Sequence, residues 1–340
     1  MDTILSVENL QVVFHTYAGK VQAVNDVSFS LGKGEIIGIV GESGCGKSVT
    51  ASSLMGLIPS PPGEIAGGKI LFNNKDIAKL PETELQALRG NAISMIFQDP
   101  MTSLNPVLSI GLQLAESFMI HQHFGQKDAL DKAVEMLRLV GIPAPETRIR
   151  QYPHQLSGGM RQRVMIAMAL ACNPKILIAD EPTTALDVTI QAQIVELMKQ
   201  LNEKLLTSII LISHDLGVVA GLCSRVLVMY AGKIVETASV QDLYAQPMHP
   251  YTYGLLRSVP RLDAGQTRLE SIGGQPPDLL SPPPGCAYMP RCRYAMEICH
   301  QPPPLLPTGL ERQSRCWLSH EMSLRKPESL FSAAKEGDPA

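Results

Sequence analysis

The chain has 340 residues, 45% hydrophobic and 18% charged, which is enough for a sizeable core and predicts one large domain plus an appendage. Its formal net charge of −3 gives no electrostatic basis for a nucleic acid as partner. The N-terminus has no basic region followed by a long apolar stretch, and no apolar run approaches the roughly 20 residues that span a bilayer. We therefore expect no secretory signal, and any membrane connection is expected to run through a partner.

The N-terminal part predicts short strands from Leu5 to Val40. The apolar residues of 27–31 alternate with serines, as in a half-buried strand. The glycines of 63–68 indicate a break, and the run 69–72 followed by two asparagines indicates a further strand and a turn. These segments predict an antiparallel lobe.

A glycine-rich turn follows the apolar run Ile36 to Val40. Residues 41–48, GESGCGKS, fit the phosphate-binding pattern G-x-x-x-x-G-K-[ST] at every fixed position, and 48–57 can continue as a helix. Backbone amides at such a strand-to-helix turn can converge on phosphate oxygens, Lys47 adds a point charge, and the Ser48 hydroxyl can ligate magnesium. The alternative is a glycine turn that binds nothing. The predicted nucleotide-binding residues are Gly41, Ser43, Gly44, Cys45, Gly46, Lys47, Ser48 and Val49.

Residues 107–171 read as helices that interrupt the strands. Within them Ser157 reads as the N-cap of a helix that begins with Gly158 and Gly159. A helix N-terminus with glycines can receive an anion, so this would be a second phosphate-seeking element. A plain helix cap is the alternative interpretation.

Three apolar runs, 175–180, 208–213 and 226–230, are separated by helical patterns and predict buried parallel strands of an α/β core. Asp180 and Glu181 end the first run, where open parallel sheets bind their ligands. We assign Asp180 to magnesium and Glu181 to the attacking water, and strand alternation would point the two side chains to different sides. A solvated acidic loop is the alternative.

The order of these motifs resembles that of ATP-binding cassette (ABC) ATPases, over about residues 4–258. The landmarks are the phosphate loop, Gln98 in FQDP, LSGGM at 156–160, Asp180-Glu181, Ala185-Leu186-Asp187 and His214 in SHD. The resemblance implies an α/β fold with a P-loop NTPase (RecA-like) core, an antiparallel β lobe and a helical subdomain at about 99–171. It implies a nucleotide-binding domain over 1–258 with ATP and Mg²⁺ as cofactors.

The same resemblance implies roles for single residues. Gln98 would touch the magnesium and the transport subunit, and His214 would contact the γ-phosphate. Asp187 would line the seam of a dimer in which Ser157, Gly158 and Gly159 of one cassette face the phosphate loop of another. An aromatic residue should stack on adenine, Phe14 or its rival Tyr17. Met160 departs from the family's commoner Gln, which we do not expect to abolish hydrolysis.

Beyond about residue 258 prolines become frequent, and we predict an irregular appendage over 259–340 without regular helix or strand. It holds Cys286, Cys292, Cys299 and Cys316. A disulfide framework does not suit a cytosolic ATPase, and close Cys-x-x-Cys pairs typical of structural zinc are absent from the sequence here, so the spacing leaves an iron–sulfur cluster, zinc and unligated thiols open. The other cysteines, Cys45, Cys172 and Cys223, read as packing residues.

This tail, with the HPYT segment at 249–252, resembles the C-terminal region of oligopeptide and dipeptide importer cassettes, where such cysteines ligate a [4Fe-4S] cluster. The implied function is an ATPase subunit at the cytoplasmic face of a bacterial inner membrane, peripheral, driving uptake of di- or oligopeptides. Its implied partners are a second cassette, a copy or more in keeping with the subfamily a paralogue, two transmembrane permease subunits and, indirectly, an external solute-binding protein. Open alternatives are another solute such as a nickel chelate or glutathione, a soluble non-transport cassette ATPase, and a module whose tail senses redox state.

Overall fold

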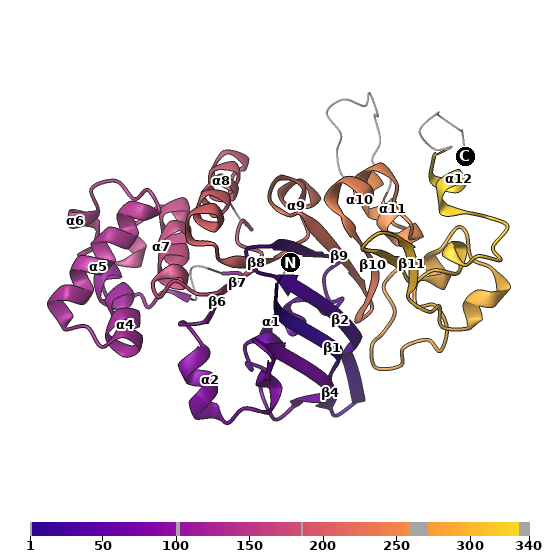
Figure 1. Ribbon diagram of the computed structural model, residues 1–340, viewed down its shortest axis with the longest axis horizontal. Coiled ribbons are helices and arrows are strands. Elements are labelled where there is room, and N and C mark those ends of the chain that lie inside the picture. The colour runs from indigo at the N-terminus through magenta and orange to yellow at the C-terminus, as the bar shows by residue number, and fades with distance from the viewer. Residues whose placement is uncertain (1, 100–102, 185, 259–270, 333–340) are drawn as a thin grey trace.

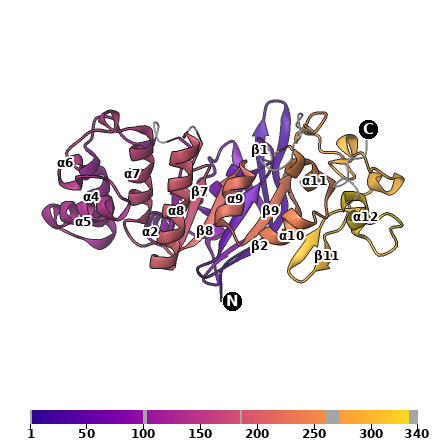
Figure 2. The ribbon, with the colours of Figure 1, turned by 90° about the horizontal axis from the view of Figure 1, so that it is seen from above.

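The structure is a computed structural model that describes residues 2–99, 103–184, 186–258 and 271–332. The described chain forms an elongated molecule with a sheet in the middle (Figures 1 and 2). Helices that include α4, α5 and α6 lie at one end, and α12 lies at the other.

The central sheet has eight strands in the described part of the chain, in the order β11-β12-β10-β9-β3-β8-β7-β6. From β9 to β6 all neighbours run parallel, which confirms the prediction of buried parallel strands, and β10, β12 and β11 add antiparallel pairs at the other edge. The bounds are β3 Ile36–Val40, β6 Ile93–Ile96, β7 Ile176–Asp180, β8 Ser208–Ser213, β9 Arg225–Tyr230, β10 Lys233–Ser239, β11 Leu306–Gly309 and β12 Arg312–Ser314.

Both faces of this sheet are covered, because alternate residues of its strands enter two different hydrophobic cores. In β3, Ile37 and Ile39 join the core shared with α1 and the antiparallel lobe, whereas Ile36 and Val40 join the core beneath the other helices. The bounds of α1 are Lys47–Leu54, three residues shorter at its end than predicted, and on the opposite face lie α7 Gly158–Leu170, α8 Val188–Leu205 and α9 Leu216–Leu222.

The antiparallel lobe is confirmed as a separate sheet of order β2-β1-β4-β5, but its first two strands are 14 residues long each and not short as predicted. Their bounds are β1 Thr3–Thr16, β2 Gly19–Gly32, β4 Gly63–Phe72 and β5 Lys75–Asp76. The predicted break at 63–68 is wrong, because these glycines lie inside β4. Gly68 has a φ of 90°, and a Cβ there would lie 2.6 Å from the carbonyl oxygens of Glu8 and Asn9. The glycine therefore permits a close approach at an irregularity in the β1–β4 pairing, without ending the strand.

The helical insertion is confirmed. Its bounds are α4 Ile110–Gln122, α5 Gln126–Leu139 and α6 Pro145–Arg148, followed by α7, and it packs around buried residues such as Leu114 and Leu137. A short helix, α2 (Glu82–Leu88), connects the antiparallel lobe to β6.

The C-terminal extension is more regular than its prolines suggest. After α10 (Val240–Ala245) and α11 (Pro250–Arg257), the chain forms the 3-10 turns η3 Met289–Arg291, η4 Glu297–His300 and η5 Trp317–Ser319, and its described part ends in α12 Pro327–Ser332. The prediction of no regular strand is wrong, because β11 and β12 form a hairpin that pairs with β10. The strand tolerates its proline because β11 is the edge strand of the sheet, where one side of the strand has no partner and a missing N–H breaks no hydrogen bond.

Candidate functional site

Four of the predicted motifs meet at the carboxyl ends of the parallel strands β3, β8, β7 and β6 of the central sheet. The phosphate loop 41–48 follows β3, His214 follows β8, Asp180 ends β7, and Gln98 comes two residues after β6. The carboxyl edge of an open parallel sheet is where such folds bind ligands.

The phosphate loop runs against its neighbours so closely that only glycine fits at two places. A Cβ on Gly41 would lie 2.2 Å from the carbonyl oxygen of Met229 in β9, and one on Gly46 would lie 2.5 Å from that of Ala23 in β2. Gly46 has a φ of 104° and is the N-cap of α1. These contacts fix the loop between two sheets while its backbone turns to open a helix.

Lys47 is hydrogen-bonded to the backbone of the phosphate loop itself. Its side chain is 5% exposed, and Nζ donates to the carbonyl oxygens of Gly41 at 2.8 Å and Glu42 at 2.9 Å. The thiol of Cys45 is buried beside it, and burial raises the pKa of that thiol. Cys45 is therefore a neutral packing residue, as are the buried Cys172 and Cys223.

Ser48 and Asp180 form a pair of oxygen donors below the loop. The Ser48 hydroxyl donates to Asp180 Oδ1 at 3.2 Å. Burial, with a smaller contribution from the Glu181 charge, raises the pKa of Asp180 despite the Ser48 hydrogen bond and the Lys47 charge. Mg²⁺ at phosphate sites typically takes one or two protein oxygen ligands and leaves the rest to substrate and water, so this pair fits such an ion.

Glu181 is held by three polar side chains. Its Oε2 accepts from Gln98 Nε2 at 3.0 Å and from Thr184 Oγ1 at 2.9 Å, and lies 3.3 Å from His214 Nδ1. Burial raises the pKa of Glu181, but the bonds from Thr184 and His214 outweigh it, and the net shift is downward. The carboxylate is therefore ionised and oriented at neutral pH.

The strand-alternation argument for Asp180 and Glu181 is wrong in its geometry. β7 ends at Asp180, and Glu181 has a φ of 48°, in the left-handed region. The two carboxylates have different partners, and Glu181 lies in the turn after the strand, so alternation along a strand does not account for this difference. A non-glycine residue in this conformation is uncommon and is found at functional turns.

The two candidate adenine partners differ in exposure. Phe14 in β1 is half-buried against the core of the antiparallel lobe, whereas Tyr17, in the turn between β1 and β2, is fully exposed. The choice of Phe14 remains a prediction.

The second anion element lies on α7, among the helices toward one end of the molecule in Figure 1, whereas α1 lies near its middle. Ser157 caps α7, since its Oγ accepts from the Met160 N–H at 3.3 Å, and Ser157 is exposed while Gly158 and Gly159 are half-buried. Asp187 caps α8 in the same way, accepting from the Ile190 N–H at 3.0 Å. The predicted cap at Ser157 is confirmed, the cap at Asp187 was not predicted, and the roles of both residues toward a nucleotide remain predictions.

The four cysteines of the tail converge. They line one cavity of about 10 Å³, roughly the space of one water molecule, beside His249, Tyr288 and Trp317. Burial raises the pKa of Cys286 and raises that of Cys292 to about 11. No group of three or more His, Cys, Asp or Glu within the described residues is arranged to hold a metal ion. The predicted [4Fe-4S] cluster therefore remains a prediction.

Comparison with known proteins identifies the family. The "ABC transporter" family profile matches residues 24–184, and the profile "Oligopeptide/dipeptide transporter, C-terminal region" matches 235–299. The Dipeptide transport ATP-binding protein DppD of Bacillus subtilis is 56% identical over 322 residues, which cover 94% of this chain and 96% of that protein. The chain belongs to the ABC transporter family. Within it, the chain is an ATP-binding and ATP-hydrolysing subunit.

Further relatives agree. The Oligopeptide transport ATP-binding protein OppD of Escherichia coli is 56% identical over 304 residues, 89% of this chain and 90% of that protein. Among solved structures, the ATP-binding cassette MJ0796, captured as a dimeric post-hydrolysis state bound to ADP and Pi, matches with a TM-score of 0.63 at 27% identity, covering 69% of this chain and 98% of that one. None of the described helices is both long and apolar enough to cross a membrane.

Two groups at the site escaped the sequence analysis. Thr184 contacts Glu181 and lies in the segment between two recognised motifs, so proximity in sequence could have suggested it. Arg291 contacts Glu42 of the phosphate loop from 249 positions away, and no sequence pattern indicates that pairing.

Proposed function

We propose that this chain is the ATP-hydrolysing subunit of a bacterial importer that takes up di- or oligopeptides across the inner membrane. The observation that carries the proposal is the joining of the phosphate loop to Gln98, Asp180, Glu181 and His214 at one sheet edge. The 56% identity to proteins named for dipeptide and oligopeptide transport supports the cargo class.

Each residue at the carboxyl ends of these strands has a role in ATP hydrolysis under this proposal. Backbone N–H groups of the phosphate loop receive the phosphates, and Lys47 turns from the carbonyl oxygens of Gly41 and Glu42 toward the β- and γ-phosphates. Mg²⁺, held by Ser48 and Asp180, would neutralise charge on the phosphates.

Glu181 accepts the proton of the attacking water. Its hydrogen bonds to Gln98 and Thr184 aim the carboxylate, and His214, whose side chain is 61% exposed, is free to reach a γ-phosphate. The site residues Gly44, Gly46 and Val49 serve through the loop backbone and the start of α1.

A second cassette completes the site in this proposal. The exposed Ser157 cap of one cassette would meet the γ-phosphate held by the phosphate loop of another, with Asp187 at the seam. The dimeric state of the related cassette MJ0796 supports this pairing. We propose a paralogous cassette as the partner, as the resemblance to peptide importers implies.

Membrane permease subunits would dock near Gln98. Three apolar residues in the stretch of chain that follows β6 are exposed: Phe97 at 46%, Val107 at 77% and Leu112 at 39%. Exposed apolar patches mark interaction sites. The chain would then be peripheral on the cytoplasmic face, and an external solute-binding protein would act through the permeases.

We further propose that the cysteine pocket holds a [4Fe-4S] cluster. The support is the donor set, because Cys286, Cys292, Cys299 and Cys316 line one cavity and four thiolates are the ligands such clusters take. The cavity would have to widen around the cluster. Iron and sulfide analysis with a visible absorption spectrum, on protein purified anaerobically, tests this. Colourless protein that binds zinc, or no metal, would refute it.

Glu181→Gln tests the catalytic assignment. In the assembly with its permeases, hydrolysis should fall by about 10²–10⁴-fold while ATP binding survives, since the amide keeps an acceptor oxygen but cannot take the proton. Glu196→Gln, exposed on α8, is the matched control and should hydrolyse ATP normally. Normal hydrolysis by Glu181→Gln would remove the proposed base.

The cargo is tested with the external binding protein and reconstituted vesicles. ATP-dependent uptake of labelled di- and tripeptides is expected, and uptake of a nickel chelate or glutathione in their place would reassign the solute. Hydrolysis by the isolated chain that no permease alters would favour a soluble ATPase.

A further inference from the structure

Arg291 of the C-terminal extension contacts the phosphate loop directly. It lies in η3, immediately before Cys292, and the two terminal nitrogens of its guanidinium both donate to the Glu42 carboxylate. Nη1 donates to Oε2 at 2.6 Å and Nη2 donates to Oε1 at 2.8 Å. Such a forked pair fixes direction as well as distance.

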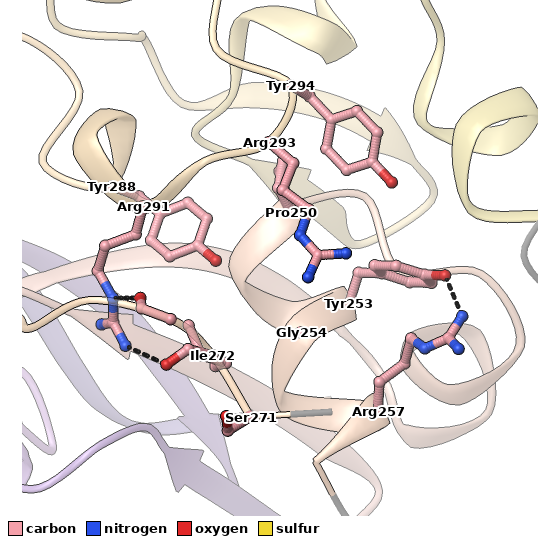
Figure 3. A pocket seen from close by; sticks show the side chains of 11 residues that line it. Pro250, Tyr253, Gly254, Arg257, Ser271, Ile272, Tyr288, Arg291, Arg293 and Tyr294 are labelled. Atoms are coloured by element: carbon pink, nitrogen blue, oxygen red, sulfur yellow. Dashed lines mark hydrogen bonds between the residues drawn. The ribbon is translucent and has the colours of Figure 1, made fainter. Parts of the chain in front are cut away.

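The guanidinium is held in place by its other donors. Nε donates to the carbonyl oxygen of Gly273 at 2.8 Å, and Nη2 also donates to that of Ile272 at 3.4 Å (Figure 3). Nη1 also donates to the Tyr230 hydroxyl at 3.3 Å. Its central carbon lies 5.8 Å and 5.9 Å from the ring centroids of Tyr230 and Tyr288. The Arg291 side chain is 3% exposed. A guanidinium with all its donors engaged has little freedom to leave Glu42.

Glu42 is in turn held at three points. Its side chain is bound by Arg291, its backbone N–H donates to the Tyr251 hydroxyl at 2.8 Å, and its carbonyl oxygen accepts from Lys47. Residues of α1, α11 and η3 thus set the position of the second residue of the phosphate loop.

Glu42 also places a negative charge inside the loop that must receive a triphosphate. An uncompensated carboxylate there would repel the phosphates and attract Lys47 away from them. Arg291 is the cation that faces it.

We propose that Arg291 is a positioning residue for ATP binding. It neutralises the charge of Glu42 and holds the first turn of the phosphate loop in a conformation that can receive phosphate. The inference rests on the proposed nucleotide function and adds a requirement to it: the C-terminal extension completes the ATP site of its own chain. ATP affinity therefore depends on a segment adjoining the cysteine pocket.

A double-mutant cycle on the full chain tests the proposal, with ATP affinity measured by displacement of a fluorescent nucleotide. Arg291→Gln should raise the Kd for ATP about tenfold in the natural sequence, within the range of coupling between contacting residues. In a Glu42→Gln background the same change should raise it less than about threefold, because no carboxylate is left to neutralise. A role confined to folding the extension would cost the same in both backgrounds.

In the assembled transporter, Arg291→Gln should raise the KM for ATP and leave kcat at saturating ATP within about twofold, since interactions lost equally from ground and transition state alter KM alone. Arg293→Gln is the control, because Arg293 lies two residues along on the same segment and is exposed. Arg291→Lys, which keeps the charge and loses the fork, should fall between the wild type and Arg291→Gln. If Arg291→Gln does not fold, Arg291→Lys with and without Glu42→Gln replaces it in the cycle.

Equal effects of Arg291→Gln in the two backgrounds, or an unchanged Kd for ATP, would overturn this inference and leave the proposed function intact. A wild-type chain that binds no ATP would overturn both.

Discussion

Replacing Glu236 with Gln probes a buried charge at the junction between the core and the C-terminal extension. Glu236 in β10 is fully buried, and its carboxylate accepts the N–H groups of Met248 at 2.7 Å and His249 at 2.9 Å, with Arg312 of β12 at 3.6 Å. Burial raises the pKa of Glu236 to about 7 in spite of these partners. Burial also lowers the pKa of His249 to about 3, so the His249 ring is neutral and offers the carboxyl no positive charge.

The raised pKa of Glu236 determines how the free energy of unfolding changes with pH. The folded state holds the Glu236 proton more tightly than the unfolded state, whose pKa is near 4.5. The protonated carboxyl therefore contributes stability that is fully present below pH 4.5 and is lost as the pH rises through about 7. A shift of about 2.5 pH units corresponds to about 3 kcal/mol of unfolding free energy.

Glu236→Gln should remove this contribution. Urea unfolding, followed by circular dichroism at several pH values, gives the free energy of unfolding of wild type and variant. The wild-type value minus the variant value should fall by about 3 kcal/mol between pH 4.5 and pH 7, whatever the two absolute stabilities are. Glu196→Gln, on the surface of α8, should give a difference that stays flat. A flat difference for Glu236→Gln as well would mean that the carboxyl is not buried as the structure has it.

Three further outcomes follow from the geometry. Gly41→Ala should abolish nucleotide binding, because the added Cβ would lie 2.2 Å from the Met229 carbonyl oxygen. Gly44→Ala should cost only the left-handed backbone strain of about 1–2 kcal/mol, because no heavy atom lies within 4 Å of the added Cβ. Titration with a fluorescent nucleotide compares the affinities of the two variants. Asp180→Asn should raise the Mg²⁺ concentration for half-maximal hydrolysis roughly tenfold or more, and unchanged magnesium dependence would contradict its role. Leu114→Ala, at a fully buried position of α4, should lower the free energy of unfolding by about 2–5 kcal/mol in denaturant titration, and a loss below 0.5 kcal/mol would contradict its place in the core.

Local signals predicted the sheet edge well. The phosphate loop, the acidic pair and His214 each follow a predicted apolar run that is a parallel strand in the structure, and parallel strands end on one side, so these groups come together there. The strand before Gln98, β6, was not predicted, and Gln98 was found only through the family resemblance. The Ser157 cap was predictable for the same reason, since a cap depends on the next few residues.

Long-range contacts were not predictable in this way. The glycines of 63–68 suggested a break in the strand. The reason for Gly68 is instead the close approach of the Asn9 backbone in another strand, which the local sequence does not show. The conformation of Glu181 depends on the turn after β7, which alternation cannot foresee. The pairing of Arg291 with Glu42 requires η3 to pack beside Tyr230 of β9, far away in the sequence.

The hairpin of β11 and β12 has a consequence for where the chain can be shortened. Without it, β10 would present its free backbone N–H and C=O groups along one side, and unpaired groups of that kind recruit strands from other molecules. Pro307 in β11 then ends the ladder, since it has no N–H to offer a further strand. A cassette trimmed at residue 258 to leave only the nucleotide motifs would therefore keep its catalytic groups and lose its protection against aggregation.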